Sequence, residues 1–220
     1  DRGDIDLVVP IDYPGFNLRF AARAHAMGFK VIYYICPQVW AWCRSRIPKM
    51  AAIVDRLITI FPFEEAHFRG THLDVKFAGH PLVDEARALL ESPERELPWG
   101  RGPGVALLPG SRTNEIEKLL PVMWGAAAIL EQRRPELGFI VAAPSDREAS
   151  LIGTMIEELP NGPTRCSVVT TNTRQVLRQA RAAMVASGTA TIEAALMGCP
   201  MVVAYKVVPL TYLLGKLLVK

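Results

Sequence analysis

LLPGSRTNE, residues 107–115, is the stretch that decides the fold of this chain of 220 residues. An apolar run of strand length enters a turn of small residues, and polar residues that can begin a helix follow directly. This succession is the repeating unit of a parallel sheet covered by helices. The stretch therefore predicts an α/β fold.

The same stretch is also a candidate binding site. Backbone N–H groups at the beginning of a helix, with Arg112 beside them, suit phosphate oxygens. The turn is not a Walker loop, because the ending Gly-Lys-Ser/Thr is absent. The alternative is a capped helix whose arginine is solvated.

The alternation of strands and helices extends in both directions. Asn17 is expected to cap a helix that ends at Gly28, between the first two strands. Further helices are expected after Glu115, around residues 147–158, in a short segment before residue 182, and after Thr189. Strands are expected at residues 5–11, 30–35, 56–61, 75–79, 105–109, 139–144, 166–171, 182–187 and 200–205.

A change of composition at residues 91–104 divides the chain, because prolines, glycines and charges replace periodic apolar residues there. We expect residues 1–90 and 105–220 to form two partial Rossmann-like domains joined by this linker. Ligands of such domains bind at the carboxyl ends of the strands. The chain begins without methionine, as if approaching a strand, so we interpret it as a piece of a longer protein.

The composition argues against several classes of protein. The 25 Lys and Arg exceed the 22 Asp and Glu by only +3, too little to indicate a nucleic-acid partner. The four cysteines form no C-x-x-C pair and have no histidine at ligand spacing, so neither disulfides nor a metal site is expected. No apolar run reaches the roughly 18 residues of a membrane span. A cytoplasmic location fits best.

IDYPGFN, residues 11–17, places Asp12 where the first strand ends. In a parallel sheet this end of the strand faces the ligand. A carboxylate there can accept a proton from a substrate hydroxyl. The alternative is that Asp12 only caps the local turn.

SGTATIEAALMGCP, residues 187–200, repeats the strand-to-helix turn. Ser187, Gly188 and Thr189 form a second polar turn at a helix start, which suits phosphate. Glu193 follows about one turn later, where it can meet a sugar hydroxyl. The alternative is a first-turn carboxylate that only complements the helix dipole.

Two segments combine apolar residues with cations. VWAWCRSRIPK contains Trp40 and Trp42 beside Arg44 and Arg46, and PLTYLLGKLLVK carries two lysines on an expected short helix. Such segments suit a membrane surface or an acylated anion, although a half-buried helix is the alternative for the second. His80 ends a strand and either contacts a ligand or bonds to backbone.

Six segments, in matching order across nearly the whole chain, resemble the lipid-A-disaccharide synthase family: IDYPGFN, PQVWAW, FPFEEAHF, FAGHPLVD, LLPGSRTNEI and SGTATIEAALMGCPMVVAYKVVPLTYLLGKLLVK. The resemblance implies a GT-B glycosyltransferase with two Rossmann-like domains, both incomplete here. It implies an inverting transfer of 2,3-diacylglucosamine from its UDP conjugate to the 6-hydroxyl of 2,3-diacylglucosamine 1-phosphate. The products would be the β-1,6-linked disaccharide 1-phosphate and UDP.

The resemblance also implies the surroundings of the enzyme. It would bind peripherally to the cytoplasmic face of the inner membrane of Gram-negative bacteria, without a cofactor, a metal ion or nucleic acid, and a homodimer is a further expectation. The chain by itself would be inactive, because segments at both ends of the family pattern are absent.

The family pattern implies roles for individual residues. Asp12 matches the essential aspartate and would be the general base. Cys43 departs from the family, which often has arginine at this position. The donor site would comprise Gly110, Ser111, Arg112, Ser187, Gly188, Thr189 and Glu193, the last on the ribose. Contacts with the acceptor or the membrane would come from Asn17, Trp40, Trp42, Arg44, Arg46 and His80.

Other classes remain as alternatives. One is another UDP-sugar enzyme of the same architecture, such as a UDP-N-acetylglucosamine 2-epimerase or the muramyl-lipid glycosyltransferase. Epimerases usually carry a double glycine followed by adjacent glutamates where this chain has SGTATIEAA. The other is a non-catalytic nucleotide-sugar or lipid-binding module.

Overall fold

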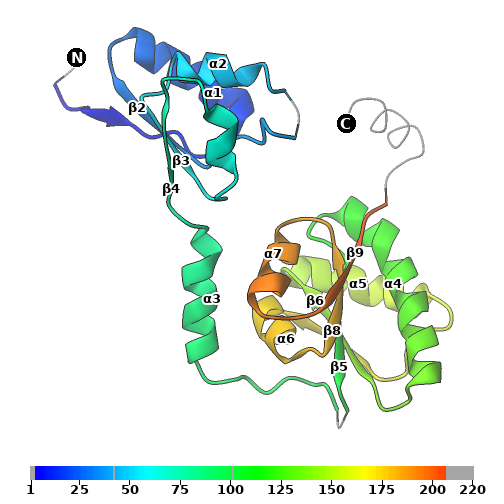
Figure 1. The fold of residues 1–220 in the computed structure, drawn as a ribbon. Helices are drawn as coiled ribbons and strands as arrows, with labels where there is room; N and C mark the ends of the chain where they lie inside the picture. The colour runs from blue at the N-terminus through cyan, green and yellow to red at the C-terminus, as the bar shows by residue number, and fades with distance from the viewer. Residues whose placement is uncertain (1–2, 42, 101, 207–220) are drawn as a thin grey trace. The chain divides into compact units, whose positions relative to one another are not determined.

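The computed structural model describes residues 3–41, 43–100 and 102–206. They divide into two compact units, one up to Pro81 and one from Leu82 onward. Each unit contains one sheet whose described strand pairs run parallel, as Figure 1 shows. The strand orders are β1-β2-β3-β4 and β7-β6-β5-β8-β9. The predicted fold class, α/β with parallel sheets, is confirmed.

In the first unit, every second residue of β2 is buried against the helices that cover the sheet. Val31, Tyr33 and Leu57 are fully buried and pack with residues of α1 and α2. The described elements are β1 (Leu7–Val8), α1 (Pro14–Ala26), β2 (Lys30–Tyr34), α2 (Arg46–Ala51), β3 (Arg56–Thr59), the 3-10 helix η1 (Glu64–Phe68) and β4 (Asp74–Phe77).

The predicted helix cap at Asn17 is wrong. α1 begins at Pro14, because proline fixes a helical φ and lacks an N–H that would be unpaired in the first turn. Asn17 therefore lies inside the helix. Its Nδ2 donates to the carbonyl oxygens of Ile11 at 2.9 Å and Asp12 at 2.8 Å, which ties the helix to the preceding turn.

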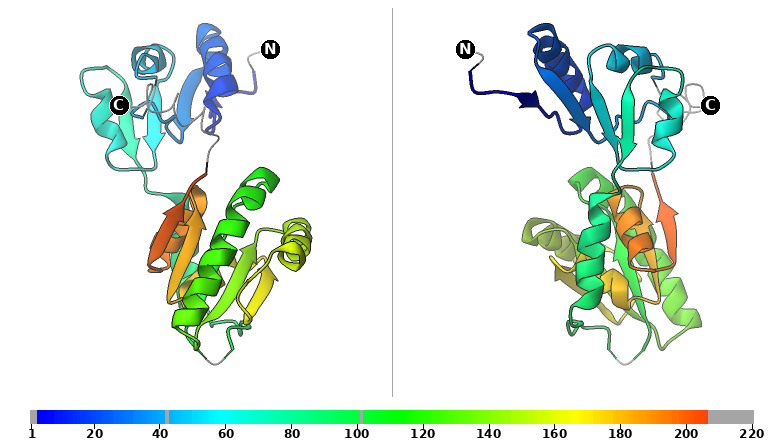
Figure 2. Two further views of the ribbon diagram at one scale, coloured as in Figure 1. Left: turned by 90° about the vertical axis from the view of Figure 1, so that its right-hand side faces the viewer. Right: turned by 60° about the vertical axis from the view of Figure 1, so that its left-hand side comes forward.

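The second unit has helices on both faces of its sheet, as the two views of Figure 2 show. Val105 and Leu107 of β5 pack in the cluster with α4 and α5, whereas Ala106 and Leu108 pack with α3, α6 and α7. The elements are α3 (Pro81–Glu91), β5 (Gly104–Leu108), α4 (Thr113–Arg133), β6 (Gly138–Ala143), α5 (Asp146–Glu158), β7 (Cys166–Thr170), α6 (Thr173–Gln179), β8 (Ala182–Ala186), α7 (Thr189–Leu196) and β9 (Met201–Ala204).

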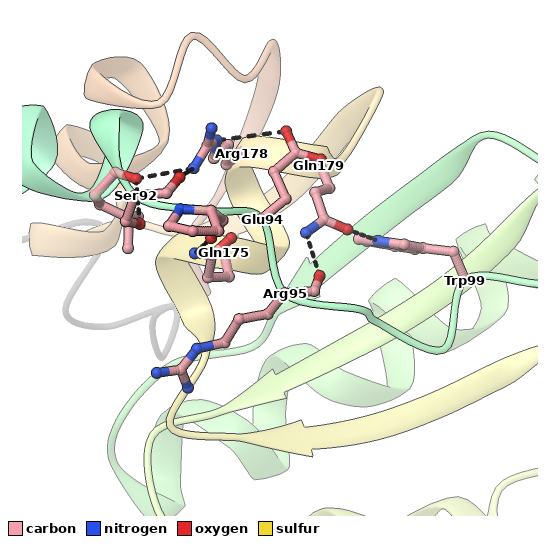
Figure 3. A network of polar contacts seen from close by, with 9 residues as sticks. Ser92, Glu94, Arg95, Trp99, Gln175, Arg178 and Gln179 are labelled. Atoms are coloured by element: carbon pink, nitrogen blue, oxygen red, sulfur yellow. Dashed lines mark hydrogen bonds and ion pairs between the residues drawn. The ribbon is translucent and has the colours of Figure 1, made fainter.

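The segment expected to be a linker, residues 91–104, is bound to α6 by the polar network in Figure 3. Arg178 donates through Nη1 to the carbonyl oxygens of Leu89 and Ser92, both at 2.8 Å. Gln179 donates to the carbonyl oxygen of Arg95 at 2.7 Å and accepts from the ring N–H of Trp99 at 3.2 Å. The segment thus packs on the second unit, and its role as a domain boundary stays a prediction.

Gly138 offers a test of this packing. A Cβ there would lie 2.0 Å from the carbonyl oxygen of Trp99, so Gly138→Ala requires the segment to move off β6. We expect a loss of about 2–4 kcal/mol of stability and a lower Tm in scanning calorimetry. Gly125→Ala is the matched control, because its Cβ would meet nothing within 4 Å, and Ala in a helix is up to about 1 kcal/mol more favourable. Equal Tm values for the two variants would contradict the packing.

Candidate active site

Two helices begin next to one cavity at the carboxyl edge of the second sheet. α4 follows β5, α7 follows β8, and these two strands are paired neighbours. The cavity, which we call the α4/α7 cavity, has a volume of about 310 Å³. Its lining includes every residue that the sequence assigns to the donor site: Gly110, Ser111, Arg112, Ser187, Gly188, Thr189 and Glu193.

The start of α7 has the features of an anion site. The first N–H groups of a helix have no partner within it and carry the positive end of its dipole. Gly188 occupies the N-cap position and no side chain caps the helix. The first turn of α7 also contains no acidic residue. An anion in the cavity can therefore accept hydrogen bonds here.

The start of α4 has a carboxylate of its own. Glu115 accepts from the Ser111 N–H at 3.1 Å and from Nη1 of Arg112 at 2.7 Å. Burial raises the pKa of Glu115, but the Arg112 guanidinium and the Ser111 N–H outweigh it and hold the pKa below its usual value. The Arg112 side chain is 80% exposed, which fits the solvated arginine of the alternative and equally an arginine that a ligand can reach.

Gly110 makes this arrangement feasible. Its φ of 129° lies in the region that favours glycine. A Cβ at this position would lie 2.7 Å from Cβ of Glu115 and 2.8 Å from its Oε2. Any other residue would displace the carboxylate that holds Arg112.

Glu193 lies beyond the first turn of α7, so the alternative of a first-turn carboxylate does not describe it. Its Oε1 accepts from Nε of Arg174 at 2.7 Å. Arg174 also donates through Nη1 to Oε2 of Glu85 at 2.5 Å. Arg174 could not be predicted from the sequence, because its partners lie 19 and 89 residues away and meet it only in the folded chain.

Asp12, in the first unit, lies in a turn that is held by hydrogen bonds to the main-chain carbonyl and N–H groups of Asp12 itself. Asp12 and Tyr13 have φ values of 46° and 42°. The carbonyl oxygen of Asp12 accepts from the Tyr33 hydroxyl at 2.6 Å and from Asn17, and the Asp12 N–H donates to Tyr34. Within the part of the chain that the structure describes, the exposed Asp12 carboxylate accepts no hydrogen bond. The Asp12 side chain therefore does not cap the local turn, and this alternative is wrong for the described residues.

Tyr33 supports the Asp12 turn from β2, although no sequence pattern predicts this role. Its side chain is fully buried in β2. Burial, followed by the negative charge of Asp12, raises the pKa of Tyr33 to about 12. The hydroxyl thus remains a proton donor to the Asp12 carbonyl across the physiological range.

The predicted acceptor or membrane contacts lie in different surroundings. Trp40 and His80 belong to an aromatic cluster, with rings 5.2 Å from Phe63 and 5.4 Å from Phe61 respectively. Asn17 holds the Asp12 turn as described above. Arg44 is exposed, and Arg46 lines a cavity of about 460 Å³ with Arg19 and Lys49. Trp42 and the segment PLTYLLGKLLVK lie outside the described residues.

A family model described as lipid-A-disaccharide synthetase matches residues 2–220. The chain belongs to this family. A lipid-A-disaccharide synthase of Koribacter versatilis is 39% identical over 223 residues, which cover 100% of this chain and 57% of that protein. One from Geobacter sulfurreducens is 40% identical over 220 residues, covering 98% and 56%. The chain thus spans slightly more than half the length of these members of the lipid-A-disaccharide synthetase family.

Solved structures add to the assignment of the fold. A co-structure of S. aureus MnaA with UDP has a TM-score of 0.68 at 11% identity and covers 92% of this chain and 59% of that one. A putative UDP-N-acetylglucosamine 2-epimerase from Listeria monocytogenes has a TM-score of 0.66 at 12% identity, covering 92% and 58%. At such identities the likeness concerns the fold alone, and it confirms the Rossmann-like, GT-B class expected of a lipid-A-disaccharide synthetase.

Proposed function

We propose that the complete protein is an inverting glycosyltransferase that makes the lipid A disaccharide. It moves 2,3-diacylglucosamine from UDP-2,3-diacylglucosamine to the 6-hydroxyl of 2,3-diacylglucosamine 1-phosphate. The products are the β-1,6-linked disaccharide 1-phosphate and UDP. Family membership supports the reaction, and the observation that carries the site is the gathering of all seven expected donor residues around the α4/α7 cavity.

The donor binds with its diphosphate at the start of α7. Unpaired N–H groups and the helix dipole stabilise the negative charge that grows on UDP as the glycosidic bond breaks. Arg112 supplies a positive charge from the start of α4, which also lines the cavity. The diphosphate carries more charge than the Glu115 carboxylate, so it competes with Glu115 for the Arg112 guanidinium.

Asp12 acts as the general base on the acceptor. The 6-oxygen of the acceptor bonds to the anomeric carbon while the bond from that carbon to the β-phosphate oxygen breaks. The hydroxyl proton passes to the Asp12 carboxylate, and both bonding electrons leave with UDP. An exposed carboxylate on a turn fixed by Tyr33 and Asn17 suits this role.

We also propose that α1, in the first unit, contacts the membrane. Phe16 and Phe20 of α1 are 60% and 48% exposed, and they stack with ring centroids 6.0 Å apart. Arg19, on the same helix, adds positive charge. Exposed aromatic rings beside cations support peripheral binding to the cytoplasmic face of the inner membrane. No described helix is both long and apolar enough to span a bilayer. A homodimer is also proposed, on the resemblance alone.

The test is turnover by the complete protein in detergent with both acylated substrates. Mass spectrometry is expected to show disaccharide 1-phosphate and UDP in equal amounts. A second reaction contains UDP-N-acetylglucosamine alone, and we expect its sugar to remain unchanged. Epimerised sugar without disaccharide would replace the proposal with an epimerase. Binding of UDP without turnover of either substrate would indicate a non-catalytic module.

A further inference from the structure

One arginine joins two carboxylates beside the α4/α7 cavity. Arg174 of α6 donates to Glu193 of α7 at 2.7 Å and to Glu85 of α3 at 2.5 Å. The side chains of Arg174 and Glu193 are only 28% and 18% exposed, whereas that of Glu85 is 55% exposed. The inner pair is thus shielded from water and the outer carboxylate is not.

One of the two carboxylate oxygens of Glu193 remains available to a ligand. Arg174 engages Oε1 of Glu193, whereas Oε2 accepts no hydrogen bond from the residues that the structure describes. Glu193 lines the α4/α7 cavity. The planar guanidinium of Arg174 fixes the direction in which the Glu193 carboxylate points.

Arg174 keeps its positive charge beside Glu193 across the physiological pH range. Burial lowers the pKa of Arg174, but the hydrogen bonds that it donates to Glu193 and Glu85 outweigh this effect and raise the pKa above its usual value. The guanidinium is therefore positive at every pH at which a nucleotide would bind.

We propose that Arg174 is a positioning residue for ribose recognition, which holds Glu193 so that its Oε2 accepts hydrogen bonds from the ribose hydroxyls of bound UDP. This inference rests on the proposed function, since it requires the cavity to bind a UDP-sugar. It adds a residue that determines which nucleotides fit: UDP is preferred over an analogue without the 2′- and 3′-hydroxyls.

A second arginine on α6 provides the structural comparison. Arg178 lies one turn after Arg174, is likewise shielded, and binds the carbonyl oxygens of Leu89 and Ser92. It does not line the α4/α7 cavity, and its hydrogen bonds and ion pair within the described part of the chain go to Leu89, Ser92 and Glu94 and not to Glu193. If packing of α3 on α6 were all that mattered for nucleotide binding, loss of either arginine would have similar effects.

The test is titration calorimetry of the complete protein with UDP and with 2′,3′-dideoxy-UDP. We expect the wild type to bind UDP about tenfold more tightly than the dideoxy analogue. Arg174→Gln is expected to lose most of this ratio by weakening UDP alone. Arg178→Gln is expected to lower Tm but keep the ratio.

Each contrary outcome has a distinct meaning. A full ratio in Arg174→Gln, or the same loss of ratio in Arg178→Gln, overturns the inference. A wild type that binds both nucleotides equally removes the role of Glu193 while the donor site stands, and a wild type that binds no UDP removes the proposed function itself. If Arg174→Gln does not fold, Arg174→Lys replaces it: a full ratio there overturns the claim that the guanidinium orients Glu193, and a reduced ratio supports it.

Discussion

Replacement of Asp12 by asparagine in the complete protein is expected to lower kcat about 10³-fold and to leave the Kd for UDP unchanged. The amide has the shape of the carboxylate but cannot accept the proton of the acceptor hydroxyl. The turn itself is expected to persist, because its hydrogen bonds use the carbonyl oxygen and N–H of Asp12 and not the side chain. Steady-state formation of disaccharide measures kcat, and calorimetry measures UDP binding.

Asp6→Asn is the matched control for this experiment. Asp6 is another exposed aspartate, just before β1, and it makes no hydrogen bond among the described residues. We expect the control to turn over as the wild type does. Turnover by Asp12→Asn at the rate of Asp6→Asn would remove Asp12 as the base while leaving the enzyme assignment in place.

Replacement of Arg112 by glutamine is expected to lower the rate of the chemical step about 100-fold. In the proposed site the guanidinium faces the charge that develops on UDP, and a neutral amide would give only part of that stabilisation. Glu115 retains the Ser111 N–H as a partner, so the start of α4 should remain folded. Single-turnover kinetics with both substrates saturating separates this effect from a change in binding.

Arg134→Gln controls for the loss of a positive charge. Arg134 follows the other end of α4 and pairs with Glu136 at 2.7 Å, and both side chains are largely exposed. Such a pair contributes little to stability, and we expect the single-turnover rate of this variant to equal that of the wild type. A loss in Arg134→Gln as large as that in Arg112→Gln would show that net charge, and not the position of Arg112, decides the rate.

The centre of the second sheet was predictable because β5 and β6 are buried on both faces. All five residues of β5 and all six of β6 are buried, so each strand reads as a continuous apolar run with a turn at its end. The donor turns follow β5 and β8, and carboxyl ends of parallel strands share one edge of the sheet. The sequence pattern and the sheet topology were therefore enough to predict that Ser111 and Ser187 line one cavity.

Details that depend on tertiary packing were not predictable. Asn17 reads as a cap, yet Pro14 begins α1 and Asn17 turns back to the main chain. Glu115 had a signal, since a glutamate at the third helical position commonly reaches back to the start of the helix. Arg174 and Tyr33 had none, because their partners lie on other elements and are set by how those elements pack.

If the α4/α7 cavity holds the UDP moiety of the donor, as we propose, a crystal structure of the complete protein with UDP will show it there. We expect phosphate oxygens about 3 Å from the Thr189 N–H and from the Arg112 guanidinium, with the ribose hydroxyls on Glu193. Well-ordered UDP bound elsewhere, with Arg112 still paired to Glu115 and no phosphate at the start of α7, would contradict it.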